Sequence, residues 1–581
     1  MDGSDAFDGD DDAALRYAIA LSLQETSKSS METPIELSSD EDDGDLNKEP
    51  KYTPIPKNSE KSPSKQSSVR TQLEVAPAAP QQPATALASS FTALGLDRKK
   101  MEEERLARLG KRKATESESD TQDRRQRPRL DVQSPNHSAT KDVPRHLPYP
   151  KGTVKKTWAA GYPRKDDIKI DEILQKNELE LAVVGSFQWD ERWMLSKIDC
   201  TRTKLVCIAF ASDEAQKEDI KNNIPKGTAI RFCFPPMMPA GSMHSKLQLL
   251  KFPGYLRIVV PSGNFVPYDW GETGVMENMV FLIDLPKIDD PKLQSSNIDL
   301  GPFGEELRYF LRAQGLQDSL INSLPNYDFS EANRYRFVHT IGTTHVGDKW
   351  QRTGYCGLGR AVTSLGLNTT ENVEVDFITA SLGSLNKDLL TALYYASQGD
   401  NGLKEYETRS TKGSKNKPAP KAKLDLNDKF RIYFPSQDTV TKSRGGKDAA
   451  GTICVQSKWW DSATFPRELI RDCKSVRPGL LMHSKIIMVR HTHSNAAYAY
   501  IGSANLSESA WGRLTKERGT GNPKLTCRNW ECGVIIPAQD SSTNRSQDHE
   551  LSDFHNIIPV PMEIPGEAYA TSKRPWLYLE N

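Results

Sequence analysis

His244-Ser245-Lys246 and His483-Ser484-Lys485 are two copies of one short pattern, and apolar residues follow each copy. An asparagine comes 20 residues after the first histidine, at Asn264, and 22 residues after the second, at Asn505. On a β-strand, a histidine and a lysine two positions apart point to the same face, because strand side chains alternate. The sequence therefore predicts two similar half-sites that meet in one composite site.

The residue types in these half-sites favour phosphodiester chemistry. Histidine can attack phosphorus or transfer a proton near neutral pH, while lysine and asparagine can hold phosphate oxygens with no metal ion. A single His-x-Lys pair is more often structural, but a duplicated pair with an asparagine at a comparable distance is a specific pattern. We therefore expect both copies to bind one phosphate.

The hydrophobic pattern predicts a strand-rich α/β fold around both copies. In the first half we expect strands at 204–211, 247–252, 255–260 and 279–285, a turn at Pro253-Gly254 and a helix at 303–313. In the second half we expect strands at 373–380, 430–434, 484–490, 497–501 and 530–536 and a helix at 386–398.

Length and charge distribution set the domain boundaries. The chain has 581 residues and a formal charge of zero, but residues 1–50 are acidic and residues 95–130 are basic. A segment of this composition buries too little apolar surface to fold. We predict a disordered regulatory tail over residues 1–145, then two folded halves at 150–325 and 326–581.

Three motifs in the tail suggest partners and location. Residues 8–27 resemble a ubiquitin-interacting motif; its apolar and small residues at helical spacing are Leu15, Ala18, Ile19 and Ser22. An amphipathic helix for another partner is the alternative. Residues 34–43 resemble a SUMO-interacting motif, although a solvated acidic stretch is an equal alternative. Two basic clusters within 111–129 form a bipartite nuclear-localisation pattern, or else a solvated charge run.

The cysteines and the apolar stretches indicate the compartment. The eight cysteines form no Cys-x-x-Cys pair and no zinc-like spacing. The sequence shows no apolar signal core and no membrane span. We therefore expect a reduced intracellular protein, located in the nucleus, with no metal, cofactor or membrane association, and a monomer.

The duplicated motifs resemble the phospholipase D superfamily, in which two such motifs meet at the pseudo-twofold interface of two α-β-α halves. Most members carry an aspartate five residues after each lysine, but this chain has Lys251 and Arg490 there. That loss, together with residues 502–512 (G-S-A-N-L-S-E-S-A-W-G) and 530–534 (W-E-C-G-V), is specifically similar to the tyrosyl-DNA phosphodiesterases. The similarity covers about residues 155–580.

The resemblance implies a mechanism and a role for each site residue. His244 would be the nucleophile that attacks a DNA 3′-phosphotyrosyl bond, and His483 would be the general acid and then the general base. A 3′-phosphate and a topoisomerase I-derived peptide would be the products. The non-bridging oxygens would be held by Lys246, Lys485, Asn264 and Asn505.

The resemblance also implies supporting residues. Glu531 is expected to orient His483, and Glu277 to orient His244; an unpaired surface carboxylate is the alternative for Glu277. Hydroxyls and backbone groups in three loops would bind DNA phosphates, at Ser384, Thr343 and Ser507. Animal relatives tend to have a DNA-contacting aromatic residue at the position of Ala240, so that contact is missing here.

Two alternative functions remain open from the sequence. The chain could be another phospholipase-D-superfamily nuclease or phosphodiesterase, or a ubiquitin- or SUMO-reading adaptor on an inactive enzyme fold. The expected DNA is a 3′-blocked end, single-stranded or in a nicked or frayed duplex. The missing aspartates argue against the first alternative, and the intact histidines, lysines and asparagines argue against the second.

Overall fold

The computed structural model describes residues 147–224, 228–288, 299–410, 424–538, 552–554, 557–569 and 573–577. The tail predicted for residues 1–145, with its ubiquitin-like, SUMO-like and nuclear-localisation segments, lies outside these ranges. Within them, no helix is both long and apolar enough to cross a lipid bilayer.

The first sheet has eight strands in the order β2-β1-β9-β7-β6-β3-β4-β5. They are β1 (Thr153–Thr157), β2 (Asp167–Ile168), β3 (Leu181–Gly185), β4 (Lys204–Ile208), β5 (Ile230–Cys233), β6 (Gln248–Phe252), β7 (Tyr255–Pro261) and β9 (Met279–Pro286). Strands β3, β4 and β5 are parallel, while β6, β7 and β9 alternate in direction. The predicted Pro253-Gly254 turn joins β6 to β7, and Gly254 there has a left-handed φ of 92°, which glycine adopts without strain.

The second sheet has seven strands in the order β10-β20-β17-β16-β12-β13-β14. They are β10 (Arg336–Thr340), β12 (Val373–Ile378), β13 (Phe430–Phe434), β14 (Ile470–Asp472), β16 (Ile486–His491), β17 (Ala497–Gly502) and β20 (Glu531–Pro537). From β1 onward, the first sheet has the same order and the same pattern of directions. The predicted α/β fold with two similar halves is therefore confirmed.

Two small sheets lie beside the large ones. One contains β11 (Thr344–His345), β18 (Arg513–Lys516) and β19 (Pro523–Thr526). The other pairs β8 (Met276–Glu277) from the first half with β15 (Leu481–Met482) from the second, in parallel. This second pairing matters for the site, because β15 ends immediately before His483.

Helices pack against both large sheets, and α6 reaches across to β10 of the second half. In the first half they are α3 (Ile170–Leu174), α4 (Glu191–Lys197), α5 (Glu214–Asn222), α6 (Gly301–Gln314) and α7 (Asp318–Ile321). In the second half they are α8 (Gly354–Ser364), α9 (Lys387–Ser397), α10 (Leu403–Ser410), α11 (Gln437–Thr441), α12 (Ser457–Trp460) and α13 (Glu508–Trp511). The helices predicted at 303–313 and 386–398 are α6 and α9, and Asn386 caps α9 by accepting a hydrogen bond from the Leu389 N–H.

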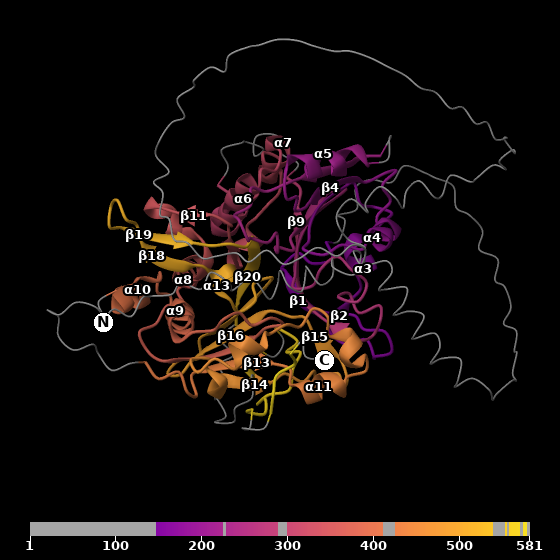
Figure 1. Ribbon diagram of the computed structural model, residues 1–581. Coiled ribbons are helices and arrows are strands. Elements are labelled where there is room, and N and C mark those ends of the chain that lie inside the picture. The colour runs from indigo at the N-terminus through magenta and orange to yellow at the C-terminus, as the bar shows by residue number, and fades with distance from the viewer. Residues whose placement is uncertain are drawn as a thin grey trace, which may run out of the picture.

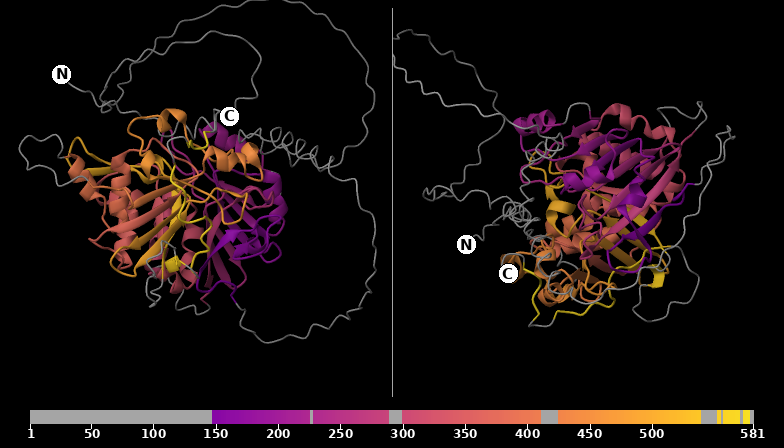
Figure 2. Two further views of the ribbon diagram at one scale, coloured as in Figure 1. Left: turned by 90° about the horizontal axis from the view of Figure 1, so that it is seen from below. Right: turned by 90° about the vertical axis from the view of Figure 1, so that its right-hand side faces the viewer.

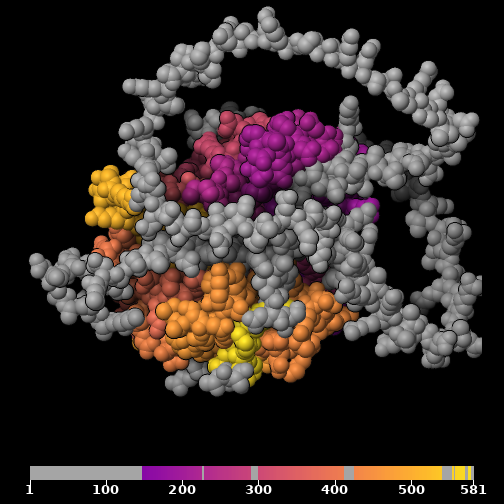
Figure 3. Space-filling view, in the orientation of Figure 1, coloured from indigo at the N-terminus to yellow at the C-terminus, as the bar shows by residue number. Residues whose placement is uncertain are grey.

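The two halves share a buried core. One apolar cluster contains Ile258 and Phe281 of the first sheet together with Met488 and Val534 of the second, and Phe310 of α6 lies in it as well. Each such side chain contributes about 1.5–3 kcal/mol when buried. The halves lie side by side in Figures 1 and 2, and the space-filling view shows the first half above the second (Figure 3).

One local prediction is wrong. The His-x-Lys motifs do not lie inside the strands, because β6 begins at Gln248 and β16 begins at Ile486. Both motifs lie in the extended segments that enter these strands, at the line where the two halves meet.

Candidate functional site

The segment that carries His244 is held by the second half of the chain. The backbone N–H of His244 donates to the carbonyl of Trp530 at 3.0 Å, and the Trp530 N–H donates to the carbonyl of Ser242 at 2.9 Å. A short parallel bridge thus joins residues 242–244 to the start of β20. The position of the first histidine therefore depends on the opposite half.

The segment that carries His483 is held by the first half in the same way. The backbone N–H of His483 donates to the carbonyl of Glu277 at 3.0 Å, and the Leu481 N–H donates to the carbonyl of Val275 at 3.0 Å. These bonds belong to the β8–β15 pair. The two histidines are therefore placed by reciprocal contacts across the interface.

Glu531 is the partner of His244. The Nδ1 atom of His244 lies 2.8 Å from Oε2 of Glu531, which also accepts a hydrogen bond from the hydroxyl of Ser503. The amide of Asn529 donates to the other carboxylate oxygen at 3.1 Å. The expectation that Glu531 orients His483 is wrong, because β20 runs beside the segment of His244.

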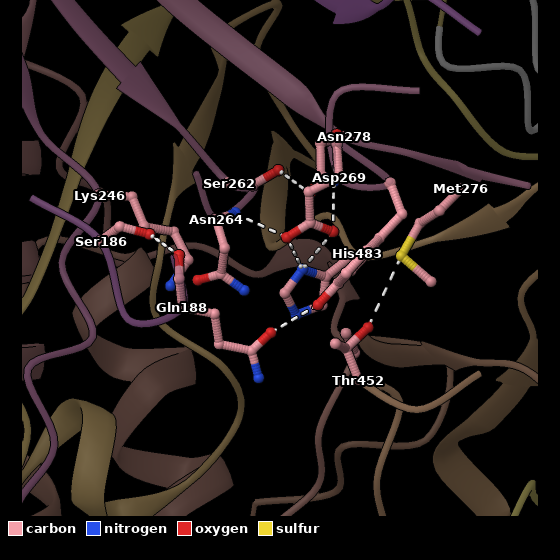
Figure 4. A network of polar contacts seen from close by, with 12 residues as sticks. Ser186, Gln188, Lys246, Ser262, Asn264, Asp269, Met276, Asn278, Thr452 and His483 are labelled. Carbon is pink, nitrogen blue, oxygen red and sulfur yellow. Dashed lines mark hydrogen bonds and ion pairs between the residues drawn. The ribbon is translucent and has the colours of Figure 1, made fainter. Parts of the chain in front are cut away.

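Asp269, which the sequence motifs did not single out, is the partner of His483. Nδ1 of His483 lies 3.1 Å from each carboxylate oxygen of Asp269 (Figure 4). The backbone N–H of Asn264 donates to the same carboxylate at 2.6 Å, and the amide of Asn278 donates to it at 3.2 Å. The one available signal was the position of this aspartate five residues after Asn264, which keeps it close to the motif.

Glu277 does not orient His244, so that expectation is also wrong. Its side chain is fully buried and contacts the guanidinium of Arg477 and the hydroxyl of Ser475. Side chains alternate along an extended segment, so Glu277 and Asn278 point in opposite directions. Glu277 therefore points away from the histidines.

Asn278 occupies the position in the first half that Glu531 occupies in the second. The hydroxyl of Ser262 donates to Oδ1 of Asn278 at 2.9 Å, just as the hydroxyl of Ser503 donates to Glu531. Asn278 acts on His483 indirectly, because it donates to Asp269 and Asp269 contacts the imidazole, as Figure 4 shows. The two halves thus use different side chains to orient equivalent histidines.

Both lysines are buried at the centre of the site. Lys246 is 1% exposed and Lys485 is 0% exposed. The ammonium of Lys246 donates to the carbonyl of His244 at 2.8 Å, and that of Lys485 donates to the carbonyls of His483 at 2.5 Å and Ser262 at 3.3 Å. Two buried ammonium groups form a site for an anion.

The two asparagines are anchored differently. Oδ1 of Asn505 accepts hydrogen bonds from the N–H groups of Ser381, at 3.1 Å, and Ala380, at 3.3 Å, which leaves the amide NH₂ to donate. Oδ1 of Asn264 is buried and has no hydrogen-bond partner within the part of the chain that the structure describes. In Figure 4 its side chain lies between Lys246 and His483.

The buried setting lowers the pKa values of the bases. Burial, with further effects from the nearby lysines, lowers the pKa of His244 to about 4 and that of His483 to about 4. Burial lowers the pKa of Lys246 to about 8 and holds the pKa of Lys485 well below its usual value, with the charge of Lys246 adding to the effect. With these values both imidazoles are neutral at pH 7.

The carboxylates respond in the opposite direction. Burial acts to raise the pKa of Glu531, but His244 and Lys246 outweigh it and the pKa is lowered. Asp269 behaves likewise, because His483 and Lys485 outweigh its burial. Both groups are therefore ionised, and each fixes its imidazole so that Nε2 is the nitrogen available to react.

The family model of the tyrosyl-DNA phosphodiesterases matches residues 153–570. This chain belongs to the tyrosyl-DNA phosphodiesterase family. It is accordingly a phosphodiesterase of the hydrolase class, and the family substrate is DNA whose end is linked to protein.

Curated relatives and a solved structure agree with this membership. A probable tyrosyl-DNA phosphodiesterase of Caenorhabditis elegans is 24% identical over 361 residues, which are 58% of this chain and 69% of the relative. Tyrosyl-DNA phosphodiesterase 1 of Arabidopsis thaliana is 22% identical over 459 residues, which are 70% of this chain and 71% of the relative. The yeast tyrosyl-DNA phosphodiesterase structure has a TM-score of 0.51 at 18% identity and covers 73% of this chain and 100% of its own, which shows the shared fold.

The positions of the absent superfamily aspartates hold cations in ion pairs. Lys251 lies on β6 and its ammonium is 2.9 Å from Glu180. Arg490 lies on β16 and its guanidinium is 2.6 Å from Glu374. Neither cation pairs with a carboxylate that orients a histidine.

The three residues predicted to bind DNA phosphates are exposed or half-buried in loops. Ser507 follows Asn505 closely and caps α13, since its side chain accepts the N–H of Ala510 at 3.2 Å. The Gly383 N–H donates to the carbonyl of Leu506 at 3.1 Å, which puts Ser384 beside Ser507. Thr343 is exposed, and its carbonyl accepts the N–H of Cys527 at 3.1 Å.

Phe187 is a further residue at the site that no sequence motif indicated. It follows β3, and its ring centre lies 5.2 Å from that of His244. Ala240, where the aromatic contact was expected to be missing, is half-buried and has a left-handed φ of 68°. The aromatic ring beside the first histidine therefore comes from the segment that follows β3.

Proposed function

We propose that this protein hydrolyses the 3′-phosphotyrosyl bond between DNA and a topoisomerase I-derived peptide. The observation that carries the proposal is the pair of buried imidazoles, each tied at Nδ1 to a carboxylate and each accompanied by a buried lysine. Two imidazoles of opposite roles and two cations supply what a two-step displacement at phosphorus needs.

In the first step, Nε2 of His244 attacks phosphorus and the bond to the tyrosine oxygen breaks. Its pKa of about 4 keeps this imidazole unprotonated and nucleophilic at pH 7. His483 gives its proton to the tyrosine oxygen as that oxygen leaves. A bound phosphodiester anion raises the pKa of His483, because negative charge beside an imidazole favours its protonated form.

In the second step, His483 takes a proton from water while the water oxygen attacks the phosphohistidine. The phosphorus–nitrogen bond breaks, His244 is restored and DNA leaves with a 3′-phosphate. Asp269 stabilises the imidazolium that forms at His483, and Lys246 and Lys485 hold the non-bridging oxygens.

The proposal extends to substrate form and location. We infer that 3′-blocked single strands, or nicked and frayed duplexes, bind along the rim formed by Thr343, Ser384 and Ser507, so that the enzyme works as an end-processing exonuclease. Nuclear location and binding to ubiquitin and SUMO are proposed from the tail motifs alone. A monomer suffices, because one chain supplies both histidines.

The test is turnover of an oligonucleotide with a 3′-phosphotyrosyl end in the presence of EDTA. We expect release of tyrosine and of a 3′-phosphate end, because lysines and asparagines take the place of a metal ion. In the described ranges, no three His, Cys, Asp or Glu side chains are grouped to hold a metal. Loss of activity in EDTA that Mg²⁺ restores would contradict the proposal.

A further inference from the structure

Glu277 and Arg477 form a buried ion pair next to the second histidine. Glu277 is 0% exposed and Arg477 is 8% exposed. Nε of Arg477 donates to Oε2 of Glu277 at 2.8 Å, and the hydroxyl of Ser475 donates to Oε1. None of these three side chains touches an imidazole, so the reaction as described above does not use them.

The pair fixes the chain that leads into His483. The same guanidinium donates to the carbonyl of Thr157, at the end of β1, at 2.9 Å. The carbonyl of Glu277 accepts the N–H of His483 at 3.0 Å. Glu277 therefore holds both ends of the segment from Arg477 to His483. Its carboxylate binds the side chain of Arg477, and its backbone carbonyl accepts the N–H of His483.

The adjacent residue holds the imidazole of the same histidine. Asn278 donates to Asp269, and Asp269 contacts Nδ1 of His483. The backbone N–H of Asn278 donates to the hydroxyl of Thr157 at 2.9 Å. The dipeptide Glu277-Asn278 thus fixes both the backbone and the ring of His483. Its counterpart beside His244 is Trp530, whose Nε1 donates to the carbonyl of Pro236 at 2.9 Å and whose carbonyl accepts the His244 N–H, so the anchor of the first histidine is a single neutral hydrogen bond and not an ion pair.

We propose that the Glu277–Arg477 pair is a positioning device for the acid–base histidine, an inference that rests on the proposed function. A general acid must hold its proton within hydrogen-bond reach of the leaving oxygen, and a misplacement of about 1 Å can cost on the order of 100-fold in rate. The attack by His244 has no such dependence on this pair. The pair therefore governs the acid–base role of His483 and not the attack by His244.

A matched control separates positioning from simple stability. Arg257 and Asp284 form another buried ion pair, within the first half, at 2.7 Å with both side chains fully buried. That pair contacts α3 and Tyr255 and no residue of the site. Replacing Asp284 should weaken the fold as much as replacing Glu277, without a selective effect on His483.

The experiment compares two leaving groups in single-turnover measurements of the first step. One oligonucleotide carries 3′-phosphotyrosine and the other carries a 3′-(4-nitrophenyl) phosphate, whose leaving oxygen is a much weaker base and needs little help from an acid. Glu277→Gln should slow tyrosine release by about 10- to 100-fold and nitrophenol release by less than about 3-fold. Asp284→Asn should change both rates by the same factor.

Milder variants keep the test decisive if Glu277→Gln does not fold. Arg477→Lys and Ser475→Ala each remove part of the contact and should show the same selectivity to a smaller degree. Equal slowing of both substrates in every folded variant would overturn the inference. Failure of the unmodified enzyme to release tyrosine would instead contradict the proposed function.

Discussion

The crossed pairing of carboxylates and histidines predicts opposite kinetic defects for Glu531→Gln and Asp269→Asn. Glutamine has the shape of glutamate and can still accept a hydrogen bond from Nδ1 of His244, but it has no charge. A hydrogen bond to a charged partner contributes about 1.5–3 kcal/mol. Since Glu531 is buried, solvent does not screen this contribution.

The charge matters most when His244 becomes positively charged on bonding to phosphorus. A neutral hydrogen bond contributes only about 0.5–1.5 kcal/mol, so the loss of the difference, roughly 1–1.5 kcal/mol, should slow formation of the covalent intermediate by roughly 5- to 13-fold. Breakdown of the intermediate should not slow, because a less stabilised imidazole is a better leaving group. Glu531→Gln should therefore be slow and should accumulate no adduct.

Asp269→Asn should behave in the opposite way. His483 loses the carboxylate that stabilises its imidazolium, so it becomes a poorer base for the hydrolytic step. The assay is rapid quenching of a single turnover, with the protein–DNA adduct measured on denaturing gels. If Glu531→Gln accumulates the adduct and Asp269→Asn does not, the pairing seen in the structure has no bearing on the roles of the histidines.

Three other outcomes are expected. The value of kcat/KM should fall as pH rises through about 8, because Lys246 has its pKa lowered to about 8 and loses its charge above that pH. A pH profile of Lys246→Arg should lack this decline in whatever activity remains, because arginine keeps its charge. His244→Ala should form no covalent adduct with DNA, whereas His483→Asn should trap one, and an adduct with His244→Ala would reverse the assigned roles. A shortened chain beginning at residue 147 should keep its turnover of a short oligonucleotide. It should lose nuclear accumulation, measured by microscopy, and ubiquitin binding, measured by pull-down. A fragment that folds but shows no turnover would mean that the tail contributes to the active site.

Local patterns in the sequence predicted the strands well. The run at 430–434 coincides with β13, and the runs at 255–260 and 279–285 lie within β7 and β9. These segments are buried on both faces, so their apolar character alone identifies them. The duplicated motifs likewise predicted that His244, Lys246, His483 and Lys485 would meet, and the structure brings them together.

The partners of the histidines could not be derived in the same way. His244 and Glu531 are 287 residues apart, and their contact exists only because β20 crosses to the segment of the other half. The choice between Glu277 and its neighbour Asn278 depends on which side of an extended segment faces the site, and a shift of one residue reverses it. Comparing the halves at Ser262 and Ser503 would have pointed to Asn278 as the counterpart of Glu531.

The reciprocal backbone contacts between the halves have an evolutionary consequence. In a symmetric dimer of a single half, the same substitution would alter both histidine environments at once, so neither histidine could specialise. Joining the halves in one chain removes that constraint. The glutamate on one side and the asparagine–aspartate relay on the other are a divergence that a fused gene permits, and under the proposed mechanism they would let one imidazole evolve toward attack while the other evolves toward proton transfer.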